Sequence, residues 1–448
     1  MSAVSPARKA AFQILMAVER GTAHSDDLLR GNVVNALSTA DRHLATALVL
    51  GVLRWQIRID HALQSLLKRP GAKLDEEIRI ALRLGAFQIL HMDRIPARAA
   101  IDESVELAKQ AGHKFASSMV NAVLRKVAVF RADLLEESAM DLALSHAHPA
   151  WMAERWMSHY GVDATRAICE HGQRQPAHTI RVVDSGAEKK LTAAGIEVIQ
   201  NELVSAARTV TSGDVTSTAE FQEGRIRIQD EGSQLVAEIA AQGNPGAILD
   251  CCAAPGGKTL ILAERNPQAP VLAYESSEPR VEQLRKRIAG FGDRIECRLG
   301  DITESTEEAR FDVALADVPC SGTGTLGRNP EIRHRFRAED LPRQAERQRA
   351  ILSAAIRAVR PGGAVIYSTC SLEPEENEEV VVAVLAETPN AGALSLESRI
   401  KGLATEGILT SSGAERLQQS ITSDGALRLL PGAFHTDGFF IALIEKKS

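Results

Sequence analysis

Apolar positions recur at helical spacing throughout the first 140 residues. Residues 10–21 place Phe12, Leu15 and Val18 at this spacing and end at a glycine, a common helix stop. The same pattern continues over residues 41–67, 75–92, 95–112 and 115–130. We therefore expect residues 1–140 to form an all-α domain.

The middle of the chain carries shorter patterns of two kinds. Helical spacing appears over residues 150–159 and 163–171, after the polar connection SHAHPAW at 145–151. Short apolar runs that suit strands follow at 178–183, 191–200 and 224–229. These patterns predict a small α+β domain over residues 146–225.

From residue 226 onward, short apolar runs alternate with helical patterns. The runs lie at residues 246–251, 270–275, 294–300, 311–318 and 363–369, and one more follows at 437–447. Alternation of this kind predicts a mostly parallel, doubly wound α/β sheet. We expect this third domain to span residues 226–448.

Length and charge agree with several domains and give a mixed indication about partners. A chain of 448 residues is too long for one compact core. The net charge is −6, whereas nucleic-acid binders are usually basic. Residues 1–140 carry 19 Lys and Arg against 15 Asp and Glu, so this part is cationic at +4 and the remainder carries −10.

The cysteines and the apolar runs indicate a cytoplasmic protein. Six cysteines in a chain of this length, with no CxxC pair, are typical of free thiols in a reducing compartment. The N-terminal stretch is amphipathic and charged, unlike a secretory signal. The longest apolar run, residues 44–53, is too short to cross a bilayer. We expect no membrane segment.

A glycine-rich loop follows the first strand of the predicted sheet, in the stretch LDCCAAPGGKT. A P-loop needs a glycine where Cys252 stands, and no GxGxxG is present, so nucleotide-phosphate sites are poorly supported. An ordinary turn between strand and helix explains this loop nearly as well as a cofactor site does. Glu275 and Asp301 end the next two strands, which favours a nucleoside-bearing cofactor without a phosphate chain.

Two isolated cysteines, Cys320 and Cys370, follow the fourth and fifth strands. Adjacent strands of a parallel sheet end at one edge, so both thiols are expected to face one cleft. Three interpretations compete. Buried cysteines often act as small apolar residues. Together with Cys251 and Cys252 they offer four thiolates to a metal, although the spacing matches no familiar zinc site. The third is nucleophilic chemistry by one thiol, assisted by the other.

The stretches LDCCAAPGGKT, DVPCSGTGTLGRNPEIRHRF and YSTCSLEPEENE resemble the signatures of the Nol–Nop–Sun family of RNA 5-methylcytosine methyltransferases. The chain is most similar to the bacterial RsmB (Sun, Fmu) branch, which acts on 16S ribosomal RNA. The resemblance covers nearly the whole chain. It implies a NusB-like helical domain, a ferredoxin-like small domain and a Rossmann-like class I methyltransferase domain.

The resemblance also implies S-adenosylmethionine as methyl donor and assigns roles to individual residues. Cys370 corresponds to the nucleophile that attacks carbon 6 of cytosine, and Cys320 to the residue that assists release. We expect Asp317 to stabilise the adduct. The implied donor-binding residues are Cys252, Ala253, Ala254, Pro255, Gly256, Gly257, Lys258, Glu275, Asp301 and Asp317. Cys251, where an aliphatic residue is commoner, and Glu275, where Asp is more usual, depart from the family pattern.

Basic residues follow the Cys320 motif and suit RNA phosphates, since they lie next to the expected cleft. We expect Arg328, Arg333 and Arg335 to contact RNA, although a solvated basic face is the usual meaning of such a run. The expected partner is 16S ribosomal RNA or a small-subunit assembly intermediate, bound by a monomer. By contrast, Glu373, Glu375 and Glu376 are interpreted as acids at the start of a helix.

Three other functions remain open. The same machinery can methylate another RNA, chiefly transfer RNA. A non-catalytic assembly factor can keep a relic methyltransferase fold, although the retained Cys320 and Cys370 argue against this. A DNA cytosine methyltransferase normally attacks with the cysteine of its PC motif and does not need a second cysteine after a TC motif. No metal site is expected.

Overall fold

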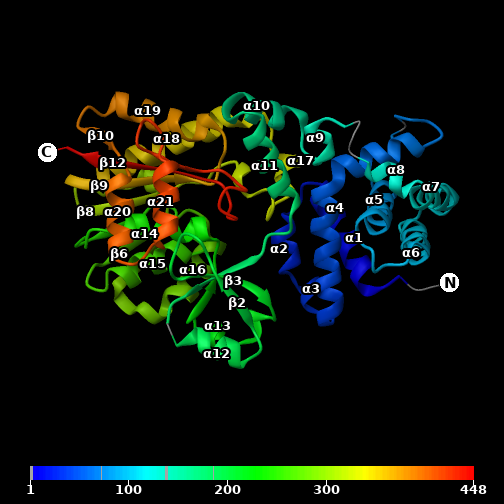
Figure 1. Ribbon diagram of the computed structural model, residues 1–448, viewed down its shortest axis with the longest axis horizontal. Helices are drawn as coiled ribbons and strands as arrows, with labels where there is room; N and C mark the ends of the chain where they lie inside the picture. The colour runs from blue at the N-terminus through cyan, green and yellow to red at the C-terminus, as the bar shows by residue number, and fades with distance from the viewer. Residues whose placement is uncertain (1–3, 72, 137–139, 185, 448) are drawn as a thin grey trace. The chain divides into compact units, whose positions relative to one another are not determined.

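The computed structural model describes residues 4–71, 73–136, 140–184 and 186–447 (Figure 1). The chain divides into two compact units. The first consists of Met1–Arg174 with Leu326–Arg335, and the second of Gln175–Thr325 with Phe336–Ser448. The chain therefore passes from one unit to the other after Arg174, after Thr325 and after Arg335.

The first unit is built from helices, as the apolar spacing predicts. Its elements are α1 (Pro6–Glu19), α2 (Ser25–Leu29), α3 (Asn32–Asn35), α4 (Thr39–Leu66), α5 (Glu76–His91), α6 (Ala97–Gln110), η1 (Lys114–Ala116), α7 (Ser117–Val129), α8 (Arg131–Leu135), α9 (Leu142–Ser145), α10 (Ala150–Tyr160), α11 (Val162–Gln173) and α17 (Ile332–Arg335). The prediction of an all-α N-terminal region is confirmed.

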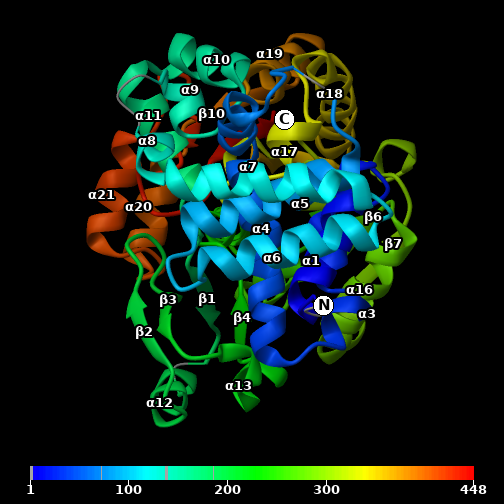
Figure 2. The ribbon, with the colours of Figure 1, turned by 90° about the vertical axis from the view of Figure 1, so that its right-hand side faces the viewer.

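Helix α5 is the centre of this unit, because its residues from Ile80 to Leu90 are all buried. It packs against α4, α6 and α7 (Figure 2). Small residues permit the close approach: a side chain at Gly51 of α4 would collide with the ring of Phe87. At Gly85 of α5, a Cβ atom would lie 2.5 Å from Leu124 of α7.

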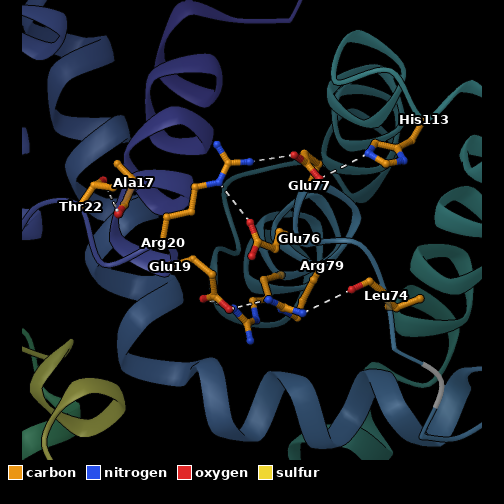
Figure 3. Close-up of polar contacts among 10 residues, drawn as sticks. Ala17, Glu19, Arg20, Thr22, Leu74, Glu76, Glu77, Arg79 and His113 are labelled. Atoms are coloured by element: carbon orange, nitrogen blue, oxygen red, sulfur yellow. Dashed lines mark hydrogen bonds and ion pairs between the residues drawn. The ribbon is translucent and has the colours of Figure 1, made fainter.

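Charged side chains join the end of α1 to the start of α5 (Figure 3). Arg20 contacts Glu76 and Glu77 at 3.1 and 3.0 Å, and Glu19 bonds Arg79 at 2.6 Å. Exposed pairs such as those of Arg20 stabilise a fold by about 0–1 kcal/mol each. The buried guanidinium of Arg83, which bonds both Glu19 and Asp60, is the firmer tie between α5 and its neighbours.

The second unit begins with a small antiparallel sheet in the order β2-β3-β1-β4. Its elements are β1 (His178–Val182), α12 (Ala187–Ala193), β2 (Glu197–Gln200), β3 (Ala207–Ser212), η2 (Val215–Ser217), α13 (Ala219–Gln222) and β4 (Ile226–Ile228). Arg181 of β1 bonds the buried Glu238 at 2.6 Å, and Arg227 of β4 bonds Glu264. These ion pairs hold the small sheet against the helices that follow.

The large sheet has the order β10-β12-β9-β8-β5-β6-β7, with β11 paired to β12. Its strands are β5 (Ile248–Asp250), β6 (Val271–Glu275), β7 (Ile295–Leu299), β8 (Phe311–Asp317), β9 (Val359–Thr369), β10 (Ala391–Leu394), β11 (Leu427–Leu429) and β12 (Phe439–Lys446). Strands β5 to β9 pair in parallel, whereas β12 runs antiparallel to β9, β10 and β11. The predicted doubly wound, mostly parallel sheet is confirmed.

Helices cover both faces of this sheet and bury separate apolar cores (Figure 1). One face carries α14 (Glu231–Ala241), α15 (Gly257–Arg265), α16 (Glu278–Ile288), α20 (Glu397–Thr405) and α21 (Ser411–Gln419). The other carries α18 (Leu341–Ala358) and α19 (Glu378–Glu387). Short 3-10 helices, labelled η, complete the unit: η3 (Ala289–Arg294), η4 (Ile302–Glu304), η5 (Thr323–Thr325), η6 (Ala338–Asp340) and η7 (Pro374–Glu376).

The strand order indicates where a fold of this kind binds its ligand. From β5 the chain adds β6 and β7 on one side, and then returns to add β8 and β9 on the other. Ligands of open α/β sheets bind beyond the carboxyl ends of the strands, at the point where the order reverses. In this sheet that point lies between the ends of β5 and β8, at Asp250 and Asp317.

Candidate active site

Two thiols meet beyond the ends of β8 and β9. These strands pair in parallel, with Asp317 opposite Ser368, so the segments that follow them start side by side. The Sγ atoms of Cys320 and Cys370 lie 3.3 Å apart. The expectation that both thiols face one place is thus met by the geometry.

Asp317 connects this pair to the glycine-rich loop. Its carboxylate accepts a hydrogen bond from Ser368 Oγ at 2.7 Å and forms an ion pair with Lys258 Nζ, also at 2.7 Å. Burial lowers the pKa of Lys258, but Asp317 outweighs it and raises that pKa above its ordinary value. Lys258 therefore stays charged and sets the orientation of Asp317.

Cys320 keeps its proton next to Cys370. The hydrogen bond to Cys370 is the largest cause that raises the pKa of Cys320, and burial adds to it, so this pKa lies well above the ordinary value. Cys320 is thus a poor nucleophile in this arrangement, because the thiolate is the reactive form of cysteine.

Glu376 lies directly behind the cysteines, which the sequence interpretation missed. As expected, it lies at the start of a helical segment, in η7 directly before α19, but its side chain is completely buried and accepts a hydrogen bond from the Ser321 backbone N–H at 2.8 Å. The position of Glu376 was therefore predicted correctly, whereas its bond to the Cys320 segment was not. In the sequence, Glu376 stands in the same acidic run as Glu373 and Glu375, and no pattern distinguishes it from these neighbours.

A small cavity of about 100 Å³ lies beside the ends of β5, β6 and β7. Its lining residues include Cys252, Glu275 and Asp301 from the predicted donor-binding set, together with Arg280 and Pro319. Two carboxylates that end adjacent strands suit the hydroxyl and amino groups of a nucleoside, because carboxylate oxygens accept hydrogen bonds. The chemistry of these residues fits the adenosine part of S-adenosylmethionine.

Residues 253–258 of the predicted set form the turn from β5 and the start of α15. Ala253 and Ala254 are buried, and Gly256 has a φ of 100°, where a Cβ would meet Leu284 at 2.7 Å. This glycine is required by the turn and by its packing on α16. Below the loop, Asp250 accepts a hydrogen bond from Thr259 at 2.7 Å, and its burial raises its pKa to about 6.

The two cysteines of the loop are not reactive thiols. Burial raises the pKa of Cys251 and of Cys252 above the ordinary value, so both carry their protons. Across the described residues, no group of three or more His, Cys, Asp or Glu side chains is arranged to hold a metal ion. In the same part of the chain, no helix is both long and apolar enough to cross a membrane.

The segment that was expected to bind RNA is partly buried in the first unit. Arg333 is 3% exposed, and its guanidinium donates to the backbone carbonyls of Arg54, Ala147 and Gly172 at 2.9, 3.2 and 2.7 Å. A guanidinium in this position is not available to a phosphate. The expected RNA contact at Arg333 is therefore corrected to a structural role.

Neighbouring residues of the segment share this role. Glu331 accepts hydrogen bonds from the Ser25 backbone N–H and from His24, each at 2.9 Å. His334 donates to the carbonyl of Leu53 at 2.7 Å. Arg335 also contacts His24, but its side chain is 29% exposed. Arg328 is half-buried. The prediction that Arg328 and Arg335 contact RNA is left untested by this geometry.

A doubly wound sheet, carboxylates at adjacent strand ends and a close pair of thiols beyond β8 and β9 define a class of protein. The chain is an S-adenosylmethionine-dependent RNA methyltransferase of the Rossmann-like type. Three family models match it in succession. The NusB family matches residues 5–129, the ferredoxin-like domain of RsmF/B-like methyltransferases matches 148–215, and the 16S rRNA methyltransferase RsmB/F family matches 238–445.

Full-length relatives identify the family. The chain is 34% identical over 457 residues to the probable ribosomal RNA small subunit methyltransferase B of Bacillus subtilis, covering 98% of each chain. It is 31% identical to the ribosomal RNA small subunit methyltransferase B of Pseudomonas putida, over 93% of this chain and 96% of that one. The chain belongs to the RsmB/F family of 16S rRNA methyltransferases.

A solved structure shares the whole architecture. The crystal structure of PH0851 superposes with a TM-score of 0.78, covering 99% of this chain and all of the other, at 24% sequence identity. This likeness establishes the fold. The predicted succession of a NusB-like, a ferredoxin-like and a methyltransferase region is confirmed by the family models together with this structure.

Proposed function

We propose that this protein methylates carbon 5 of a cytosine in 16S ribosomal RNA, with Cys370 as the nucleophile and Cys320 as the residue that assists release. The observation that carries the proposal is the 3.3 Å separation of the two sulfurs, next to the Asp317–Lys258 ion pair. Family membership and the substrate named for the relatives support the choice of RNA.

The raised pKa of Cys320 supports this division of roles between the two cysteines. Carbon 5 of cytosine is a poor nucleophile until a thiolate adds to carbon 6, and Cys320 is poorly suited to that addition because its raised pKa keeps it protonated. Asp317, which is held by Lys258 and Ser368, would stabilise the adduct through the ring nitrogen or the amino group. Bound S-adenosylmethionine supplies an electrophilic methyl group.

Formation of the adduct prepares Cys320 for the last step. Once the Cys370 sulfur is bonded to carbon 6, the largest cause of the raised Cys320 pKa is gone, and that pKa falls. Cys320 then loses its proton to solvent. Its thiolate takes the proton from carbon 5, while the bond between carbon 6 and the Cys370 sulfur breaks and its electron pair returns to Cys370.

The donor site is assigned to the cavity beside the ends of β5, β6 and β7. Glu275 would hold the ribose hydroxyls and Asp301 the adenine amino group, while Cys252 lines the same cavity. The predicted loop residues Ala253, Ala254, Pro255, Gly256 and Gly257 would form its floor, with Lys258 acting on Asp317. We also propose that Arg328 and Arg335 contact RNA, that the enzyme acts as a monomer in the cytoplasm, and that free 16S RNA or an assembly intermediate is its substrate.

Two substitutions test the assignment of the thiols. Cys370→Ala is expected to abolish methyl transfer from labelled donor to 16S RNA, because no adduct forms. Cys320→Ala is expected to accumulate a covalent RNA adduct that migrates slowly on a denaturing gel. Cys297→Ala, a half-buried cysteine on β7, is the control and should retain activity. An adduct in Cys370→Ala instead of Cys320→Ala would reverse the two roles.

A further inference from the structure

We propose that Glu376 is a positioning residue that holds the Cys320 and Cys370 segments together and so sets the distance between the two sulfurs. The proposal rests on the catalytic roles given above for the two cysteines. It concerns a residue that touches neither sulfur. Its carboxylate lies behind both segments, within the second unit.

The carboxylate joins the two cysteine segments through hydrogen bonds from each. From the Cys320 segment, the Ser321 backbone N–H donates to Oε1 at 2.8 Å and the Ser321 hydroxyl to Oε2. From the Cys370 segment, the Ser371 hydroxyl donates to Oε2 at 2.5 Å. Each of these serines directly follows one of the reacting cysteines. A single side chain therefore fixes the residue next to each sulfur.

Helix α18 provides a further hydrogen-bond donor to the same carboxylate. The Gln348 amide donates to Glu376 Oε1 and also to the carbonyl of Pro319, both at 2.9 Å. Pro319 directly precedes Cys320. The Cys320 segment is thus held on both sides of the cysteine, by Gln348 before it and by Glu376 after it.

The two segments also bond to each other, in keeping with a single rigid arrangement. Gly324 N–H donates to the carbonyl of Cys370 at 2.9 Å, and Leu372 N–H donates to the Thr323 hydroxyl at 2.9 Å. The hydroxyls of Ser321 and Ser371 lie 3.0 Å apart. Glu376 adds to these bonds, because its carboxylate accepts from both segments and from α18.

The burial of Glu376 argues for a specific purpose. Its side chain is fully buried, and among the described residues its carboxylate is bonded by one backbone N–H, two hydroxyls and one amide, none of which is a cation. A buried carboxylate without a cation is costly, and the cost is offset only by well-placed donors. An apolar residue would fill this volume at lower cost, but it could not tie the two segments together.

The test uses methyl transfer and a probe of sulfur spacing that needs neither RNA nor methyl donor. Phenylarsine oxide binds two thiols that lie close together, releasing one water as two arsenic–sulfur bonds form. Cys320→Ser gives the background from other cysteines. Glu379→Ala is the matched control, because Glu379 is an exposed glutamate on α19, three residues further along the chain.

Glu376→Ala is expected to bind the arsenical at least ten-fold more weakly than the wild type and to lower kcat about 10²-fold, since misplacement by about 1 Å costs a factor of this size. KM for the donor should stay within about two-fold. Glu376→Gln is expected to restore most of both, because its amide oxygen still accepts from Ser321 N–H and Gln348 while the serine hydroxyls turn to accept.

Several results would overturn the proposal. One is arsenical binding by Glu376→Ala that equals the wild type; another is a wild type that binds no better than Cys320→Ser. A Glu376→Gln variant as defective as Glu376→Ala would show that charge, not the hydrogen-bond set, is what matters. If Glu376→Ala does not fold, Ser371→Ala removes one tie and should still weaken arsenical binding. A wild type that binds the arsenical but methylates no RNA would contradict the proposed function and leave this inference standing.

Discussion

Replacement of Arg333 by alanine is expected to loosen the first unit. The substitution removes a buried guanidinium that donates to three backbone carbonyls, those of Arg54, Ala147 and Gly172. These carbonyls belong to α4, to the turn after α9 and to α11. The three segments are far apart in the sequence, and Arg333 is a contact common to all of them.

The size of the effect follows from two opposing contributions. A hydrogen bond stabilises a fold by about 1 kcal/mol net, and a buried carbonyl left without a partner costs about 1–3 kcal/mol. Against this, burial without a carboxylate lowers the pKa of Arg333 to about 9, with Arg54 adding to the effect, so the charge itself is costly in the native state. We expect a net loss of about 3 kcal/mol in the local stability of this unit.

Hydrogen exchange followed by mass spectrometry measures the loss of stability in each segment separately. A loss of about 3 kcal/mol corresponds to exchange about 10²-fold faster in peptides from the three segments. Arg98→Ala is the control, because the Arg98 side chain is 93% exposed on α6 of the same unit. Unchanged exchange in these peptides, or equal acceleration in Arg98→Ala, would refute the view that Arg333 is an anchor.

Three further changes probe the second unit. Lys258→Met leaves Asp317 without its ion pair, so kcat for methyl transfer should fall about 10²-fold, and wild-type kinetics would contradict the role of Lys258. Gly324→Ala would bring a Cβ to 2.8 Å from the carbonyl of Cys370, so a lower melting temperature and weaker activity are expected in parallel; an unshifted melting curve would show that the loop yields. Asp250 has a pKa raised by burial from 3.8 to about 6, so the folded chain binds a proton that the unfolded chain releases between about pH 4 and 6. The free energy of unfolding should therefore fall by about 3 kcal/mol as the pH rises through that window. Urea titrations of Asp250→Asn at several pH values should not show this decrease.

Elements with strong periodicity were predictable, and so was the position of the two thiols. The helices of the first unit follow from apolar positions repeating at 3.6 residues, and the strands at the centre of the large sheet follow from short apolar runs, because helices bury both faces of that sheet. Cys320 and Cys370 follow two such strands, so parallel pairing was enough to bring their backbones together. The short strands β3, β10 and β11 were harder to predict, because they have three to six residues each and little pattern.

Side-chain partners distant in the sequence could not be predicted. Arg333 stands among basic residues that read as a solvated run, yet its acceptors are 161 to 279 residues away. Glu376 stands in an acidic run, and the donor that distinguishes it from its neighbours, Ser321 N–H, is 55 residues away. In both cases composition predicts exposure, and only the fold supplies the enclosing groups.

The course of the chain through Leu326–Arg335 limits how this protein can be dissected. A fragment that ends at Arg174 would lack the ten residues that satisfy the carbonyls of Arg54, Ala147 and Gly172 and the N–H of Ser25. A fragment that starts at Gln175 would carry the same ten residues with nothing to enclose them. Cutting the gene at this one linker would thus yield two damaged halves, and swapping N-terminal modules between relatives would require exchanging this decapeptide as well.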